Sequence, residues 1–442
     1  MEHSICRAQS GGFINKTVLT AFLLLAAAGL RAQEFSLAGA RSADILAAGA
    51  AAVPPAAPPV YAGEAGRKAA KPFKTVFEIK PFLTGHSSPA EVEKGLKDLF
   101  KGGIEGEELA LQTQKSLAFQ SRVYKALDAQ LALDKSWPVS VSEKRLSGNF
   151  VRETTVRFPS LVRRPGGHAS NTVVARIYEP AVKRPYCGYK YPATIILHHI
   201  LNEVELIEDL GKILSAGVLG QPAVFVVIQL PHYGERRQGG EEFLNSDLDN
   251  FRGNMAQLVL DVHLLRNYLE TRGNINAEKL SLSGLSLGSV MGLTVGAFDQ
   301  GFTGYGFLVG GVDMANIIMN RARNRPDSEI AVALRDLNPE EGFLRGELAA
   351  VDGMTWLHRY RGKKIFLQSA TRDDIVDYKN SVEPMAAPLR AQGNTLTQKI
   401  NDDQHTPTGS AINTLRNVFL PLLRFVVDGS PSLDAVCPIA VD

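Results

Sequence analysis

Between residues 151 and 428, continuous apolar runs alternate with stretches in which apolar residues recur at helical spacing. The most hydrophobic runs are ATIIL at 193–197, AVFVVI at 223–228 and KIFL at 364–367. Runs that are apolar at every position are typical of strands buried on both faces. Because helical stretches separate these runs, the pattern predicts an α/β fold with a mostly parallel central sheet flanked by helices.

We expect roughly eight strands in this sheet. Two early runs, at 154–158 and 172–178, have no helix between them and indicate an antiparallel start. The other strands are predicted at 193–197, 223–228, 280–283, 307–309, 364–367 and 396–400. The region from 313 to 360 is longer than a normal connection and could form a helical cap over a site.

Four further segments are predicted outside the 151–428 domain. Residues 1–32 combine a basic start with the apolar run TVLTAFLLLAAAGL, which is typical of a secretory signal peptide; an uncleaved membrane anchor is the alternative. Residues 33–72 are rich in Ala and Pro and predict a flexible linker. Residues 73–150 predict a helical extension, and residues 429–442 a C-terminal tail.

Two helices are expected in the 73–150 extension. The first opens at Ser88, where the serine can cap the helix and Glu91 completes a capping box. The second runs from about 116 to 133.

Composition adds little chemistry. The formal net charge of the 442 residues is +2, which gives no support for a nucleic-acid partner. Of three cysteines, Cys6 would leave with the leader, so Cys187 and Cys437 either form one disulfide in an oxidising compartment or stay as two thiols. Neither residue spacing nor motif suggests a metal site.

The strongest chemical motif is Gly284-Leu285-Ser286-Leu287-Gly288. It follows a predicted strand and precedes an apolar helix, so Ser286 is expected on a sharp strand-to-helix turn. Such a turn brings neighbouring segments close, and small residues two before and two after the serine leave room for them. The alternative is a glycine-punctuated turn that holds a buried serine.

With this motif in its strand–turn–helix context, the chain resembles the α/β-hydrolase superfamily over about residues 151–428. The resemblance implies a catalytic serine, an acid and a histidine in that order along the chain. Asp373, after the strand KIFL, fits the acid, with Asp374 the near competitor and Asp313 a lesser one. His405 lies beyond them in a loop after the last strand and fits the base.

The same resemblance implies two backbone donors for an oxyanion. The N–H of Leu287, next after the serine, is one, and the N–H of Ile200, after the strand ATIIL, is the second. His199 stands where relatives have glycine, and it either lines the pocket or packs. Tyr233 and Arg236 follow the strand AVFVVI and are candidates for contact with substrate; a turn with solvated charges is the alternative.

These features predict an exported, periplasmic or extracellular, serine hydrolase that cleaves a small carboxylic ester and needs no cofactor. No stable membrane span is expected once the leader is removed, and the sequence leaves the oligomeric state open. The alternatives are a peptidase of the same fold, similar to prolyl oligopeptidases, and a non-catalytic binding protein. The short helical segment before the domain has no blade-like repeats, which disfavours the peptidase.

Overall fold

A computed structural model describes most of the chain from residue 72 to residue 430. The described residues are 72–82, 85–145, 151–181, 188–199, 204–215, 222–239, 242–244, 247–328, 330–332, 334, 339–405 and 415–430. Apart from 415 and 416, they belong to one compact unit, Lys68–Thr408 with Asn417–Asp442. The predicted leader, nearly all of the linker, the tail after 430, and both Cys187 and Cys437 lie outside the described residues.

The centre of this unit is a ten-stranded sheet in the order β1-β2-β3-β4-β6-β5-β7-β8-β9-β10. The first four strands and the β4–β6 pair are antiparallel, and the strands from β6 across to β10 pair in parallel. The strands are β1 (Phe73–Glu78), β2 (Ser136–Arg145), β3 (Val151–Pro159), β4 (Thr172–Pro180), β5 (Tyr191–Leu197), β6 (Val224–Ile228), β7 (Ile275–Leu285), β8 (Gly304–Leu308), β9 (Lys364–Ala370) and β10 (Thr395–Asn401).

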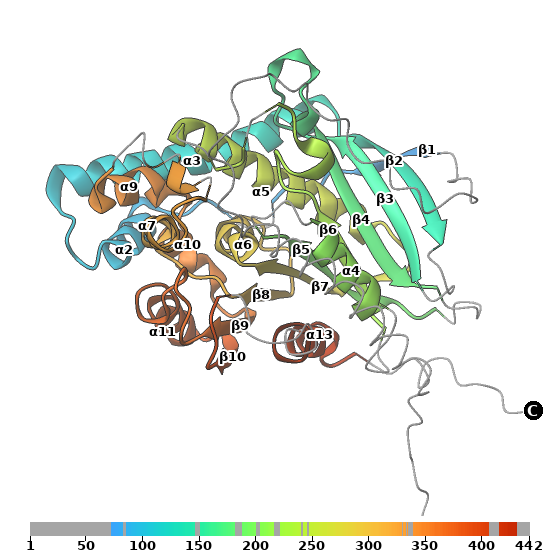
Figure 1. The fold of residues 1–442 in the computed structure, drawn as a ribbon. Helices are drawn as coiled ribbons and strands as arrows, with labels where there is room; N and C mark the ends of the chain where they lie inside the picture. The colour runs from blue at the N-terminus through green and yellow to red at the C-terminus, as the bar shows by residue number, and fades with distance from the viewer. Residues whose placement is uncertain are drawn as a thin grey trace, which may run out of the picture. The chain divides into compact units, whose positions relative to one another are not determined.

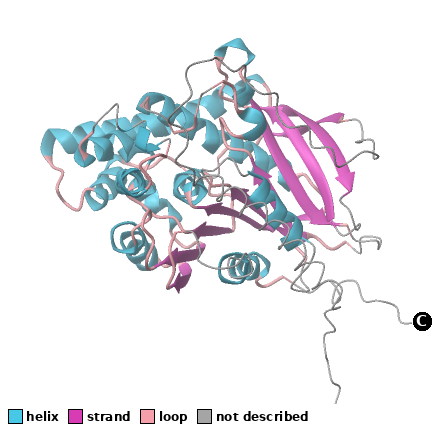
Figure 2. Cartoon of the chain, in the orientation of Figure 1, coloured by secondary structure: helices cyan, strands magenta, loops and turns pink. Residues whose placement is uncertain are grey.

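Helices cover both faces of the sheet (Figures 1 and 2). Helices α5 and α6 pack against one side of the central strands, and α4 and α13 pack against the other. The α-helices among the described residues are α2 (Pro89–Leu99), α3 (Gly106–Leu133), α4 (Val204–Ser215), α5 (Leu248–Glu270), α6 (Leu287–Phe298), α7 (Met314–Asn324), α9 (Glu341–Leu348), α10 (Gly353–Trp356), α11 (Glu383–Ala391) and α13 (Leu420–Val427). Single turns are η1 (Pro165–Gly167), η2 (Ala169–Asn171), η3 (Gly234–Arg236), η4 (Ala349–Val351), η5 (Leu357–Tyr360), η6 (Tyr378–Val382) and η7 (Leu415–Phe419).

The fold class predicted from the sequence is confirmed. Every residue of β5 and β6 is buried, as expected of strands covered by helices on both faces. The antiparallel start is present in β3 and β4. Ser88 caps α2, and the Glu91 carboxylate accepts a hydrogen bond from the Ser88 backbone N–H at 2.9 Å, so the capping box is present.

The N-terminal segment differs from the helical extension expected at 73–150. Besides α2 and α3, it contributes β1 and β2, which pair with each other and continue the sheet beyond β3. In β2 the buried side chains alternate, at Trp137, Val139 and Val141, whereas β1 buries only Phe77. The pattern in β1 is weak because a strand at the sheet edge needs few apolar residues, whereas the alternation in β2 is typical of a strand, so the helical extension expected for this part of 73–150 was wrong.

The 313–360 region folds into helices, and its two halves differ in their surroundings. Side chains of α7 line a cavity beside Ser286, as described below. The second half packs elsewhere: Gly353 contacts Leu293 of α6, and α10 packs against α2. Trp356 is fully buried in the main core, so it does not belong to a layer over the cavity.

Candidate active site

Ser286 lies on a sharp turn between β7 and α6. Its backbone angles are φ 52° and ψ −116°, in the left-handed region that L-amino acids avoid. The backbone N–H of Ser286 donates to the carbonyl oxygen of Leu308 in β8 at 2.9 Å, which holds the turn against the sheet. The strained turn lifts the serine at the carboxyl end of β7, where its hydroxyl is half-buried.

The two flanking glycines of the motif are required by close backbone contacts. A β-carbon at Gly284 would overlap the carbonyl oxygen of Gly288, and one at Gly288 would overlap the carbonyl oxygen of Leu197 at the end of β5. Since both obstacles are backbone atoms, no side-chain rotation can relieve them. The motif's small residues therefore let α6 start directly against β5.

We expect Gly288→Ala to lower the free energy of unfolding by about 1 to 3 kcal/mol, because the added methyl overlaps the Leu197 carbonyl. Urea denaturation would measure the loss. The control is Gly292→Ala on the same helix, where the new β-carbon would lie 3.5 Å from Leu197 and Phe307, an ordinary contact. That variant should be neutral or more stable by about 0.5 to 1 kcal/mol. Equal losses in the two variants would contradict this account of the motif.

Three predicted site residues form one chain of hydrogen bonds. The Ser286 Oγ and the His405 Nε2 are 2.7 Å apart, and the His405 Nδ1 is 2.8 Å from the Asp373 Oδ2. The other Asp373 oxygen accepts the backbone N–H groups of Ile375 and Val376 at 2.9 and 2.7 Å. Both oxygens of the carboxylate are thus held, which orients the imidazole toward the serine.

The competing aspartates lie elsewhere. Asp374 is partly exposed and pairs with Arg325 at 3.0 Å. Asp313 caps α7, where its side chain accepts the N–H of Asn316, and it pairs with Arg345 at 2.9 Å. Neither contacts His405, so Asp373 is the acid that the structure brings to the histidine.

Comparison with known proteins shows similarity at the level of structure. Neither a scan against protein-family models nor a search of curated proteins gives a match. Among solved structures, acetyl xylan esterase 1 from a Thermoanaerobacterium species has 16% identity and a TM-score of 0.50, over 70% of this chain and 93% of that one. An acetyl xylan esterase from a Paenibacillus species has 14% identity and a TM-score of 0.48, over 65% and 87%. This chain has the α/β-hydrolase fold.

Of the two oxyanion donors that this α/β-hydrolase fold leads us to expect, one lies in the described part. Leu287 is the first residue of α6, directly after Ser286, where the N–H groups of a helix's first turn have no partner within the helix. Ile200 lies outside the described residues.

Two buried histidines follow β5, and burial lowers the pKa of each to about 4. His198 is a structural residue: its Nδ1–H donates to the His199 carbonyl at 2.8 Å, and its Nε2 accepts the N–H of Leu230 at 3.1 Å. His199 differs, because its Nδ1 makes no hydrogen bond within the described residues. The charges of His405 and Arg321 lower the pKa of His199 further, so His199 is neutral at pH 7.

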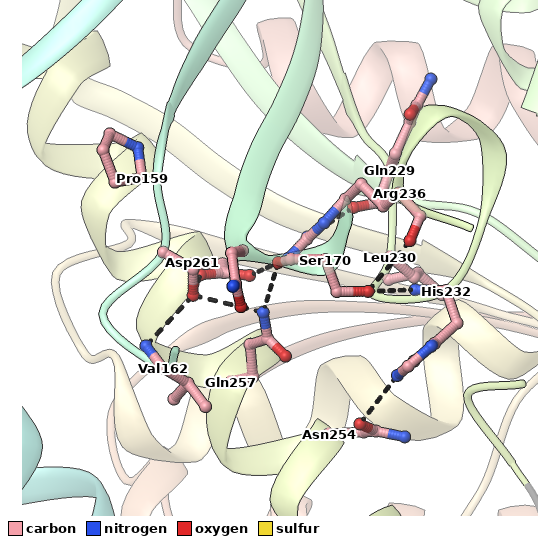
Figure 3. A network of polar contacts seen from close by, with 12 residues as sticks. Pro159, Val162, Ser170, Gln229, Leu230, His232, Arg236, Asn254, Gln257 and Asp261 are labelled. Carbon is pink, nitrogen blue, oxygen red and sulfur yellow. Dashed lines mark hydrogen bonds and ion pairs between the residues drawn. The ribbon is translucent and has the colours of Figure 1, made fainter. Parts of the chain in front are cut away.

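The predicted contact of Arg236 with substrate is wrong. Arg236 has no exposed surface, and its guanidinium pairs with Asp261 at 2.6 Å and donates to the carbonyl oxygens of Gln229 and Ser170 (Figure 3). A buried charge must be compensated, and here the compensation ties the loop after β6 to helix α5. The sequence could not separate this buried partner from a solvated arginine.

Tyr233 is also buried, with 7% of its surface exposed. Its ring packs edge-on against the imidazole of His198, with centroids 4.9 Å apart. Tyr233 therefore packs against His198, the structural histidine that follows β5.

A cavity that opens to solvent lies beside Ser286. Its walls come from the start of α6, from α7 and from the loop that holds Asp373. Met314, Ile317 and Ile318 lie on one face of α7, within the 313–360 region that the sequence suggested as a cap. The sequence analysis missed Arg321, although it falls on that same face one turn further along.

Two further observations apply only to the described part of the chain. Among these residues, no helix is long and apolar enough to cross a membrane. No group of three or more histidine, cysteine, aspartate or glutamate side chains is arranged there to hold a metal ion.

Proposed function

We propose that this chain is a serine hydrolase that cleaves a carboxylic ester through a covalent acyl intermediate on Ser286. The observation that carries the proposal is the hydrogen-bonded series from Ser286 through His405 to Asp373. A serine hydroxyl is a weak nucleophile until a neutral imidazole accepts its proton, and here the imidazole is within hydrogen-bond distance.

In the proposed first step, the Ser286 oxygen attacks the ester carbonyl while its proton passes to the His405 Nε2. Asp373 keeps the imidazole oriented and offsets the positive charge that it gains. The N–H of Leu287 donates to the oxyanion. The bond to the alcohol then breaks, and His405 gives the alcohol its proton. In the second step, water attacks the acyl group, His405 takes the water proton, and the carboxylic acid leaves as Ser286 regains its hydrogen.

The apolar walls of the cavity beside Ser286 support an ester whose acyl group is apolar and of modest size. The export predicted from the leader is also a proposal, and the position of the mature N-terminus in secreted material would test it.

The enzyme is expected to hydrolyse 4-nitrophenyl esters with a burst of one nitrophenol per active site, because the acyl intermediate accumulates when its hydrolysis is slow. The rate should pass through a maximum as the acyl chain lengthens and fills the cavity. Stopped-flow absorbance on a series from acetate to dodecanoate measures both. A preference for aminoacyl amides over all esters would favour the peptidase alternative, and no turnover of either class would favour the binding protein.

A further inference from the structure

Helix α7 presents a mixed face to the cavity beside Ser286. Met314, Ile317 and Ile318 supply apolar contacts, and Arg321 lies on the same face, seven residues beyond Met314. At 1.5 Å per residue this spacing places the backbone of Arg321 about 10 Å along the helix axis from that of Met314. The cavity therefore has an apolar body and a cationic position along α7.

Arg321 is the one charged side chain among the described residues that line the cavity. All the others except Ser286 are leucine, isoleucine, valine or methionine. The other arginines near the end of α7 do not line the cavity and pair at the surface: Arg323 lies 3.6 Å from Glu341, and Arg325 lies 3.0 Å from Asp374. Arg321 alone of the three turns toward the cavity.

The positive charge of Arg321 also affects a histidine at the end of β5. The positive charge of Arg321 contributes to the lowered pKa of His199, which also responds to His405. Arg321 and His405 thus both act on the imidazole of His199, and Arg321 and Ser286 line the same cavity.

The portion of substrate that enters this cavity is the acyl group. The alcohol must leave beside His405, because that imidazole protonates it, and His405 does not line the cavity. Ser286, which carries the acyl group between the two steps, does line it. The acyl chain is therefore the part that meets α7.

We propose that Arg321 selects esters whose acyl chain ends in a carboxylate, so that the preferred substrate is a half-ester of an aliphatic dicarboxylic acid. This rests on the proposed function. A planar guanidinium offers five N–H donors, so it can hold other contacts and still bind a carboxylate through two parallel hydrogen bonds. The apolar walls fit the methylene chain between the two ends.

The test compares monomethyl adipate with methyl hexanoate, which share a chain length and differ in the terminal carboxylate. Methanol release should give the wild type a kcat/KM for the half-ester that is about 10- to 100-fold higher, the range of a hydrogen bond to a charged group. In Arg321→Met, which keeps the apolar stem, this preference should disappear while methyl hexanoate is still cleaved. Arg321→Lys should retain part of it, because an ammonium lacks the paired geometry.

Arg323→Met is the matched control, since it removes the same charge from the same helix at a residue that does not line the cavity. Its preference for the half-ester should equal that of the wild type. Labelling by a fluorophosphonate distinguishes failure of the role given to Arg321 from failure of the proposed function. Normal labelling with no preference for the half-ester in the wild type, or an equal preference in Arg321→Met, would overturn the role of Arg321 alone. Absence of both labelling and turnover would overturn the proposed function, and the role of Arg321 with it.

Discussion

Replacing Ser286 by alanine should lower kcat for ester hydrolysis by about 10⁴- to 10⁶-fold and abolish labelling by a fluorophosphonate. The variant lacks the oxygen that would form the acyl bond, whereas the turn that carries it stays held by the backbone hydrogen bond to Leu308. Thermal unfolding should therefore change little. Initial rates and mass spectrometry of the labelled protein measure the two effects.

Ser289→Ala is the matched control for this change. Ser289 lies one turn further along α6, is fully buried, and its hydroxyl makes no hydrogen bond within the described residues. This variant should keep its labelling and most of its rate. If Ser286→Ala kept the activity of the wild type, another nucleophile would have to carry the reaction, and the proposed function would be wrong.

The second large effect is expected at Asp373. Asp373→Asn should reduce kcat by about 10³- to 10⁴-fold, because an amide can offer its N–H to the His405 Nδ1 and favour the wrong tautomer. The amide also loses the charge that offsets the imidazolium. Asp374→Asn, one residue away, removes only a partly exposed ion pair with Arg325 and should change kcat by less than about threefold.

Comparing these neighbours isolates the role of the acid from effects on the loop they share. A larger loss in Asp374→Asn than in Asp373→Asn would show that the histidine is oriented by a different carboxylate in solution. Circular dichroism of both variants should match the wild type, since each substitution keeps the size of the side chain.

Local patterns predicted the features that depend on neighbours along the chain. The continuous apolar runs at β5 and β6 indicated strands covered on both sides, because burial on two faces excludes polar residues from every position. The GLSLG motif between a strand and a helix predicted the strained turn at Ser286, since the required small residues lie within five positions. The resemblance to the α/β-hydrolase superfamily then implied His405 as the base and Asp373 as the acid, with Asp374 as its competitor.

Other features could not be predicted from the sequence because they depend on which groups meet in three dimensions. Arg236 looks like a solvated arginine in the sequence, and only the fold places it against Asp261 on α5. Strand β1 buries a single side chain, so its own sequence gives little sign of a strand. Its place in the sheet depends on β2, which pairs with β3 on one side and offers its other edge to β1. The guanidinium of Arg321 became a candidate for substrate binding once α7 was seen to line the cavity.

The sequence by itself determined the fold class and the turn that carries Ser286, the proposed nucleophile, because their physical requirements are contained in short stretches of chain. Only the tertiary structure decided between Asp373 and Asp374, whose sequence contexts are nearly the same. One carboxylate points to the imidazole and the other to a surface arginine. That direction is set by the packing of the loop after β9 against distant segments, which no local pattern encodes.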